Sequence, residues 1–539
     1  MGSVAGPTQM DPVTRQRQIH WTTKAARHAP WLAFVLFYAL FANLPYWIVA
    51  REYGFRQLGW FCIQYAAVGL VALLVPRLLA SVLLFLVIAA DLLCGICLTF
   101  NLPIRECLAN LRAAQALTGS RLLNAIAVGL VALLVAAVAA LLPGKTLPRT
   151  LRVRAALSLS AFTAVILLVD CLSFHAVTGH LPDLSATPPR LDETQSLEIR
   201  IPRFTRIPIV RLVRLQLFQA NIDAFRNRGP ASQYPVPSAT AVAVGSAGIQ
   251  PGADPAGLPN LVLVVVESWG LALDDPLHQA LVQPYLDPDL QDRYQVIQGA
   301  VSFNGPTIPG EGRELCGSAI GFQLLTASAA DLASCLPNRL DTLGYRTLAV
   351  HGMSSHMFNR STWYQNIGFR ERWFYEQFHK QGLPDCQGAF TGTCDDAIAA
   401  WIGRRLDEDS PQPSFVHWMT LNSHIPVPVP AHLANPAPCA AALALDPGSA
   451  LCSWYQLVAN VHRSVVQIAT GPLSRPTVFV IVGDHAPPFG DPALHGRFSQ
   501  TQVPYVILLP RSRHGASSSI YAHNANPSPH AKPPSRQSP

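Results

Sequence analysis

Charged residues are scarce in this sequence. Only 13% of its 539 residues are Asp, Glu, Lys or Arg, whereas 50% are hydrophobic and the mean hydropathy is +0.25. This composition argues against a wholly soluble protein and is typical of an integral membrane protein. The net charge of +7 partly reflects Lys and Arg placed beside apolar segments, so it does not indicate a nucleic-acid partner.

Long apolar runs are absent after residue 174 but frequent before it. A cleavable signal peptide is the alternative for the first run, but it begins about thirty residues into the chain and further runs follow. We therefore predict a cytoplasmic segment at residues 1–30 and a transmembrane domain of five helices at 31–174. The five windows are long and apolar enough to cross a bilayer: Trp31–Ala50, Leu58–Val75, Leu78–Phe100, Leu123–Leu142 and Ala156–Phe174.

The distribution of Lys and Arg predicts the orientation, because positively charged loops tend to stay in the cytoplasm. Loops on the opposite side hold fewer basic residues, so five spans place the chain after residue 174 outside the cytoplasm. The segment before the first window and the loop between the fourth and fifth windows are the basic ones: Arg15, Arg17, Lys24, Arg27, Lys145, Arg149, Arg152 and Arg154.

Acidic residues inside the windows are few, since a carboxylate is costly in lipid. Asp91 is expected to mark a polar contact between helices, whereas Asp170 is explained by its position near a window end.

The segment 175–258 is predicted to be juxtamembrane helix and linker. Arg200–Arg228 contains seven arginines and one acid, which favours an amphipathic helix on anionic headgroups. A basic helix packed on the soluble domain is the alternative. Gly229–Leu258 is rich in Ala, Gly, Pro and Ser and is predicted to be linker. The helical stripe would be Ile209, Leu212, Val213, Leu217 and Phe225.

No C-x-x-C motif occurs after the membrane region, which weakens a zinc-cysteine interpretation of the six cysteines there. An oxidising compartment would favour disulfides. Six cysteines permit 15 connectivities, among which three close pairs are favoured: Cys316 with Cys335, Cys386 with Cys394, and Cys439 with Cys452.

Residues 259–511 are predicted to form one α/β domain, and the Ser, Pro, His and Ala-rich residues 512–539 a disordered tail. Short, nearly continuous apolar runs alternate there with helical and loop lengths, which is typical of a sheet buried on both faces. The runs are Leu261–Val266, Tyr345–Val350, Phe415–Leu421, Val478–Val482 and Tyr505–Leu509.

Acids and imidazoles follow four of these runs directly. In an open α/β sheet the site lies beyond the carboxyl ends of the strands. Zinc and manganese prefer carboxylate and imidazole ligands, so Glu267, Asp484 and His485 are predicted metal ligands. A helix-capping acid or a surface Asp-His pair would explain one residue alone, but not the set. The residues are Glu267, His351, His424, Asp484 and His485.

Thr307 is the candidate nucleophile, because it lies in the Gly and Pro-rich segment Phe303–Glu311 just before a predicted helix. A helix N-terminus and a metal ion together lower the pKa of a hydroxyl and hold a phosphoryl oxygen. A turn residue without function is the alternative for Thr307 taken alone.

Seven stretches in order resemble the alkaline phosphatase and sulfatase superfamily. The resemblance is to its membrane-bound branch of lipoteichoic acid synthases, phosphoglycerol transferases and phosphoethanolamine transferases. It implies an alkaline-phosphatase-like domain with a central, mostly parallel sheet behind a membrane anchor. The stretches are Asn260–Trp269, Gly305–Thr307, Gly344–Gly352, Phe358–Arg360, Thr420–His424, Gly483–His485, and Leu494–Gly496 with Val503–Pro504.

The resemblance also implies roles for individual residues. Glu267, Thr307, Asp484 and His485 would hold one catalytic divalent ion, zinc or manganese, with a second ion left open, and Thr307 would attack phosphorus. The remaining residues would bind the phosphate or transfer protons: His351, His424 and His495 as catalytic imidazoles, and Phe358, Asn359 and Arg360 as substrate contacts.

The implied reaction moves a phosphoglycerol or phosphoethanolamine group from a membrane phospholipid to an envelope glycan or lipid, through a phospho-threonine. The implied location is the bacterial cytoplasmic membrane with the catalytic domain outside. Two departures matter: Thr307 cannot undergo the oxidation that sulfatases use, and Ala486–Pro488 replaces the Gly-Glu-Ser of lipid A phosphoethanolamine transferases. An extracytoplasmic phosphodiesterase or phosphatase, and a non-catalytic sensor or scaffold, are the alternatives.

Overall fold

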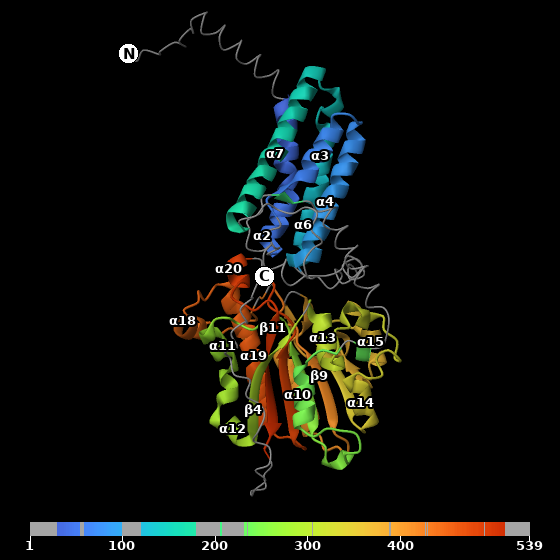
Figure 1. The fold of residues 1–539 in the computed structure, drawn as a ribbon, viewed down its shortest axis with the longest axis vertical. Helices are drawn as coiled ribbons and strands as arrows, with labels where there is room; N and C mark the ends of the chain where they lie inside the picture. Colours follow the sequence, from blue (N-terminus) through green and yellow to red (C-terminus); the bar gives the residue numbers. More distant parts are fainter. Residues whose placement is uncertain are drawn as a thin grey trace, which may run out of the picture.

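The computed structural model describes residues 30–53, 59–99, 120–178, 205–206, 231–233, 235–303, 305–387, 390–425, 427, 429–489 and 491–511. The predicted cytoplasmic segment up to residue 29, the stripe from Ile209 to Phe225 and the tail from Ser512 lie outside these residues. Figure 1 shows an α-helical bundle at one end of the described chain and an α/β domain at the other.

Four helices are long and apolar enough to cross a membrane: Pro30–Ala50, Arg77–Cys97, Ile126–Thr146 and Arg149–Ser173. They correspond to the first, third, fourth and fifth predicted windows. The elements of this region are η1 (Phe41–Asn43), α2 (Leu44–Tyr53), β1 (Phe61–Cys62), α3 (Ile63–Ala72), α4 (Arg77–Thr99), α6 (Ser120–Leu141), η3 (Gly144–Thr146), α7 (Arg149–Thr178) and β2 (Thr205–Arg206).

The second predicted span, Leu58–Val75, is not confirmed, because its helix α3 has only 10 residues. Phe61 and Cys62 are extended instead of helical, since they pair in parallel with Thr205 and Arg206 of β2. The backbone N–H of Cys62 donates to Asn43 Oδ1 at 2.8 Å, so α3 begins beside Asn43 of the first helix.

The α/β domain is built on a seven-stranded sheet of order β4-β11-β10-β3-β9-β5-β6. Strands β10, β3, β9, β5 and β6 run parallel, and β11 is antiparallel to both β10 and β4, which agrees with the predicted mostly parallel sheet. Its strands are β3 (Asn260–Val266), β4 (Tyr294–Ser302), β5 (Arg346–His351), β6 (Glu371–Trp373), β9 (Ser414–Met419), β10 (Thr477–Gly483) and β11 (Gln502–Pro510); β7 (Asp385–Gln387) and β8 (Thr391–Thr393) form a separate hairpin.

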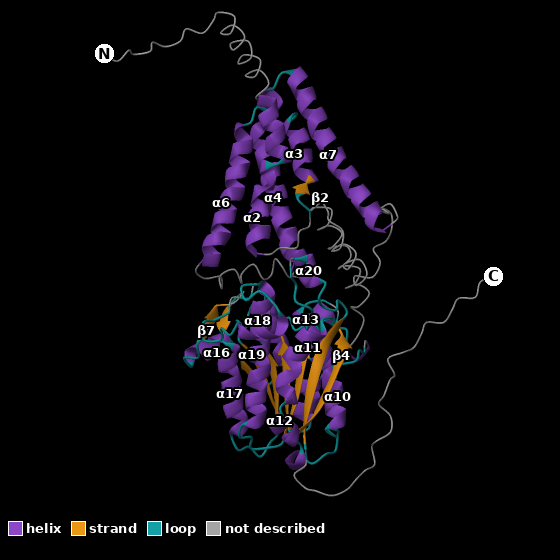
Figure 2. Ribbon diagram, turned by 90° about the vertical axis from the view of Figure 1, so that its left-hand side faces the viewer, coloured by secondary structure: helices purple, strands orange, loops and turns teal. Residues whose placement is uncertain are grey.

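Helices cover both faces of the sheet (Figures 1 and 2). They are α10 (Ala239–Ser246), α11 (Asp275–Val282), α12 (Pro288–Arg293), α13 (Thr307–Cys316), α14 (Leu336–Thr342), α15 (Arg360–Asn366), α16 (Tyr375–Lys380), α17 (Asp395–Asp407), α18 (Ala437–Leu443), α19 (Ala450–Thr470) and α20 (Pro492–His495), with 3-10 turns η4 (Ala231–Gln233), η5 (Pro255–Gly257), η6 (Gln283–Leu286), η7 (Gly321–Leu325) and η8 (Met357–Asn359).

Strand β3 shows why these residues form a central strand. All seven of its residues are buried. Val262, Val264 and Val266 pack into the core with α19, whereas Leu261, Leu263 and Val265 pack into the core with α10 and α13. Alternate side chains of a strand point to opposite faces, so a continuous apolar run is what two buried faces require.

Part of the predicted linker Gly229–Leu258 belongs instead to the α/β domain. Helix α10 lies within it, capped by the Ser238 hydroxyl, and buries Ala239 and Ala243 against the sheet. The small side chains of α10 gave this segment the composition of a linker. In the structure, they allow the helix to approach the sheet closely.

The three cysteine pairs favoured by spacing are the disulfides of the structure, Cys316–Cys335, Cys386–Cys394 and Cys439–Cys452. All six cysteines lie in the α/β domain, and this is the pattern that an oxidising compartment favours.

Candidate active site

Glu267 is the first residue after β3 and is anchored on both sides of its backbone. Its N–H donates to Thr420 Oγ1 at 2.9 Å, and its carbonyl accepts from the Ser423 hydroxyl at 2.6 Å. Ser268 follows with a positive φ of 58°, which turns the chain sharply, and its hydroxyl donates to Glu267 Oε1 at 2.8 Å. The carboxylate is therefore held at the sheet edge with little freedom.

Asp484 and His485 follow β10, the neighbour of β3, and reach the same edge. Asp484 Oδ1 accepts from the backbone N–H groups of Ser268 and His485, each at 2.7 Å. His485 Nδ1 lies 2.8 Å from the carbonyl of Ala486, which can only accept, so Nδ1 carries the proton. His485 Nε2 then faces Glu267 Oε1 and Asp484 Oδ2, at 3.4 Å from each.

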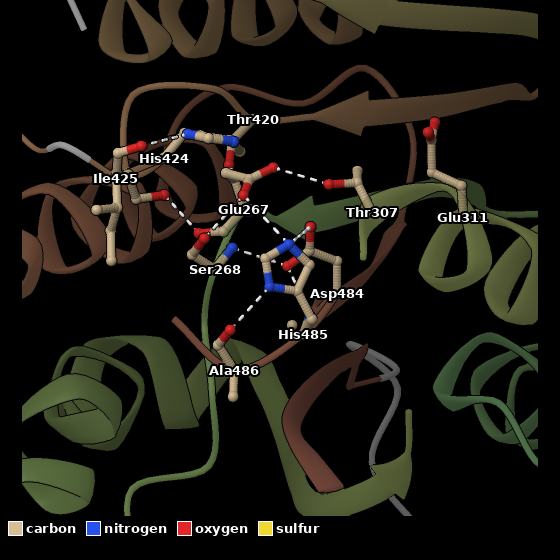
Figure 3. Close-up of polar contacts among 12 residues, drawn as sticks. Glu267, Ser268, Thr307, Glu311, Thr420, His424, Ile425, Asp484, His485 and Ala486 are labelled. Atoms are coloured by element: carbon tan, nitrogen blue, oxygen red, sulfur yellow. Dashed lines mark hydrogen bonds and ion pairs between the residues drawn. The ribbon is translucent and has the colours of Figure 1, made fainter. Parts of the chain in front are cut away.

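Thr307 is the first residue of α13, and its hydroxyl donates to Glu267 Oε2 at 3.1 Å (Figure 3). Helix α13 packs tightly against the same edge, because a Cβ added at Gly310 would lie only 3.0 Å from Asp484 Cβ. The structure thus brings together four of the predicted residues, Glu267, Thr307, Asp484 and His485, although up to 218 positions separate them in the sequence.

The donor set fits a divalent cation. One ligand atom from each of Glu267, Asp484 and His485 lies within 4.8 Å of the other two. Asp484 Oδ2 is buried and accepts no hydrogen bond from the described residues. Burial, with the adjacent Glu267 charge, raises the pKa of Asp484, and a cation would offset both causes. Two carboxylates and an imidazole suit zinc or manganese.

His351 and His424 are oriented in the same way as His485. His351 Nδ1 lies 2.9 Å from the carbonyl of Met419, and His424 Nδ1 lies 2.8 Å from that of Ile425. Burial, reinforced by the nearby Arg360 charge, lowers the pKa of His351 to about 3, so this ring is neutral at pH 7 with an unprotonated Nε2. His424 lies beside Glu267 in Figure 3.

Arg360, a predicted phosphate contact, is bound to the carboxylate of Glu311, a residue for which the sequence predicted no role. Arg360 is 2% exposed, and its NH2 donates to Glu311 Oε2 at 2.8 Å. Tyr364 and His417 also contact Glu311. Burial opposes ionisation of Glu311, but the Arg360 charge and these hydrogen bonds outweigh it and lower its pKa to about 2. The sequence spacing could have indicated a role for Glu311, because this residue lies one helical turn after Thr307 on the same helix face.

Arg313 and Glu314, two further charged residues of α13, hold the helix in place. Arg313 NH2 donates to the carbonyl of Gly483 at 2.7 Å, and Glu314 Oε2 accepts from the N–H and hydroxyl of Thr240 on α10. These hydrogen bonds connect α13 to β10 and to α10.

The remaining predicted contacts have defined surroundings. Phe358 and Asn359 both have φ of 52°, an uncommon conformation that often marks functional turns. Asn359 Nδ2 donates to the carbonyl of Leu325 at 3.2 Å. His495 is the last residue of α20 and is 4% exposed.

The family model described as Sulfatase matches residues 259–530. The chain belongs to the sulfatase family. This confirms the predicted superfamily. A search of curated proteins returned no match.

Several solved structures are similar to this sulfatase-family chain at low identity. The lipoteichoic acid synthase LtaP from Listeria monocytogenes is 13% identical, with 50% of this chain and 71% of that chain covered and a TM-score of 0.29. The Streptococcus pyogenes phosphoglycerol transferase GacH, in complex with sn-glycerol-1-phosphate, is 14% identical over 50% and 72%, with a TM-score of 0.31. The C-terminal periplasmic domain of EptC from Escherichia coli is 15% identical over 48% and 74%, with a TM-score of 0.31.

Proposed function

We propose that this sulfatase-family protein transfers a phospho-alcohol headgroup, phosphoglycerol or phosphoethanolamine, from a membrane phospholipid to an envelope glycan or lipid. The observation that carries the proposal is the Thr307 hydroxyl, hydrogen-bonded to Glu267 at the edge of a cluster fitted to a divalent cation. A threonine at this position supports phosphoryl rather than sulfuryl chemistry, because it lacks the oxidation route of sulfatases.

In the first step Thr307 Oγ1 forms a bond to phosphorus and loses its proton to water, while Glu267 Oε2, which accepts the hydrogen bond of this hydroxyl, holds the oxygen in position. The bond between phosphorus and the diacylglycerol oxygen breaks, and that oxygen takes up a proton. A divalent cation held by Glu267, Asp484 and His485 would supply positive charge beside Thr307 and the phosphoryl oxygens. Arg360, which is bound to Glu311, would contribute its guanidinium to phosphate binding.

His351 and His424 would have different roles. His351, with its pKa lowered to about 3, has an unprotonated Nε2 and can only accept there, so it suits a substrate hydroxyl. His424 is left as the acid for the leaving oxygen. In the second step the oxygen of an acceptor hydroxyl attacks the phospho-threonine and gives its proton to His351 Nε2. The bond between phosphorus and Thr307 Oγ1 breaks and this oxygen takes up a proton again, so the two steps form a ping-pong scheme. Water in place of that hydroxyl would make the protein a hydrolase.

We also propose that the catalytic domain lies outside the cytoplasmic membrane. The three disulfides and the basic loops on the side of the N-terminus support this placement. The residues before α3 together with α3 would complete the second crossing, which keeps five crossings in total.

Intact-protein mass spectrometry after incubation with phospholipid tests the proposal. We expect a covalent adduct whose mass identifies the headgroup, retained in Thr307→Ser and lost in Thr307→Ala. Adding a purified glycan or lipid acceptor should discharge the adduct faster than buffer alone. Equal discharge in buffer would establish the hydrolase, and an unchanged adduct in Thr307→Ala would rule out this nucleophile.

A further inference from the structure

Arg206 of β2 lies in the interior of the helical bundle, 115 positions after its partner Asp91 of α4. Both side chains are 1% exposed, and Arg206 NH2 lies 2.7 Å from Asp91 Oδ2. Figure 2 shows β2 among the bundle helices. The basic segment Arg200–Arg228 was predicted to lie on lipid headgroups, but at this residue it enters the protein.

The bundle satisfies the whole guanidinium of Arg206. Nε and NH2 donate to Asp91, NH1 donates to the carbonyls of Gly59 and Trp60 at 2.7 and 2.8 Å, and NH2 also donates to Asn43 Oδ1 at 3.0 Å. A guanidinium has five N–H donors, and these contacts use all of them. No donor remains for a headgroup phosphate.

Further contacts hold the same strand. Arg206 stacks on the Tyr46 ring at 3.7 Å. Thr205 donates its N–H to Asp170 of α7 at 3.0 Å, and its hydroxyl contacts the same carboxylate. Both acidic residues of the predicted spans therefore bind this strand. Gly59 allows the close approach, because a Cβ there would lie 2.4 Å from the Thr205 carbonyl oxygen.

We propose that the bundle interior is a docking site for strand β2 of the same chain, and that its residues Thr205 and Arg206 form a clasp which holds the α/β domain close to the membrane. The last helix ends at Thr178 and the described part of the domain begins at Ala231. Without the clasp, 53 residue steps (231 − 178) separate them, and with it only 25 (231 − 206). At about 3.4 Å per step, the maximum reach falls from about 180 to about 85 Å.

The consequence for activity rests on the proposed function. A short tether raises the effective concentration of membrane phospholipid at the site, because effective concentration falls roughly as the −3/2 power of tether length. Shortening the tether by the clasp therefore raises this concentration about threefold. A water-soluble phosphodiester gains nothing from the tether.

Cross-linking in the full-length protein in vesicles tests the docking itself. Phe61 and Thr205 are register partners, so a Phe61→Cys/Thr205→Cys variant should form a disulfide that keeps the two fragments joined after proteolysis between them. Thr205→Cys alone reports any linkage to native Cys62. Adding Arg206→Met with Asp91→Asn, which removes both charges together, should abolish the link. An equally strong link in that background would overturn the clasp.

Turnover of two substrates tests the consequence. Relative to the wild type, Arg206→Met/Asp91→Asn should turn over a phospholipid in vesicles about threefold more slowly and a soluble phosphodiester at an unchanged rate. If the variant turned over both substrates at the wild-type rate, or slowed on both by the same factor, the membrane-proximity role would be overturned. If the wild-type protein turns over neither, the proposed function fails, while the cross-linking result still decides the clasp.

Discussion

At the scale of single residues, Glu311 links α13, the helix that begins with the proposed nucleophile Thr307, to Arg360, the proposed phosphate contact. It is fully buried, four residues after Thr307, and binds Arg360 of α15 and His417 of β9. A buried charge that loses its partner costs about 3–5 kcal/mol. The orientation of Arg360 therefore depends on a carboxylate that need not touch substrate.

Glu311→Gln should lower the unfolding free energy by about 3 kcal/mol or more and raise the KM for phospholipid more than it lowers kcat. The matched control is Glu371→Gln, which likewise removes a carboxylate from arginine partners, in this case Arg346 and Arg405, but at a side chain that is 36% exposed. The control should cost at most about 1 kcal/mol and leave KM unchanged. Denaturation and steady-state kinetics measure both, and equal kinetics in the two variants would contradict a positioning role.

At the scale of elements, Asp395 joins the start of α17 to the turn that carries His424. Its carboxylate accepts the backbone N–H groups of Leu421 and Asn422, while its own N–H donates to Asn422 Oδ1 at 2.8 Å. Burial raises the pKa of Asp395 to about 7 in spite of these hydrogen bonds. The folded protein therefore keeps a proton there that the unfolded chain gives up near pH 4.

The stabilisation that follows from this raised pKa is present below about pH 4 and is lost as pH rises through about 7. The wild type should thus lose up to about 1.4 kcal/mol of unfolding free energy per pH unit relative to Asp395→Asn across that window. Comparing the two proteins removes contributions from other groups. Thermal unfolding from pH 4.5 to 8 measures the difference, and parallel curves would show that Asp395 does not titrate in this range.

At the scale of the whole molecule, the metal cluster joins β3, β10 and, through Thr307, α13, so an ion there would stabilise the entire catalytic domain. Adding zinc or manganese after chelation should raise the melting temperature, because binding to the folded protein adds about 2.7 kcal/mol to the unfolding free energy at a hundredfold excess over Kd. Asp484→Asn should remove that increase, whereas Asp446→Asn, at an exposed position, should keep it. Calorimetry in detergent measures this without any substrate, and a metal-dependent shift retained in Asp484→Asn would place the ion elsewhere.

The sequence alone determined the features that local pattern encodes. The apolar windows, the buried strands and the acids and imidazoles at strand ends depend on hydropathy and on residues adjacent in the chain. The parallel strands then necessarily carry Glu267 and Asp484 to one edge. The disulfides followed from short sequence separations, 8 to 19 residues.

Only the tertiary structure decided which distant charges meet. Arg206 and Asp91 are 115 positions apart, and Arg360 and Glu311 are 49 apart, so neither pair leaves a periodic signal. Residues 61–62 form a strand where hydropathy predicted a membrane span, because their backbone pairs with that of residues 205–206, which are distant in the sequence. Hydropathy measures the preference of a segment for lipid, whereas buried charges choose their partners by geometry across the whole fold.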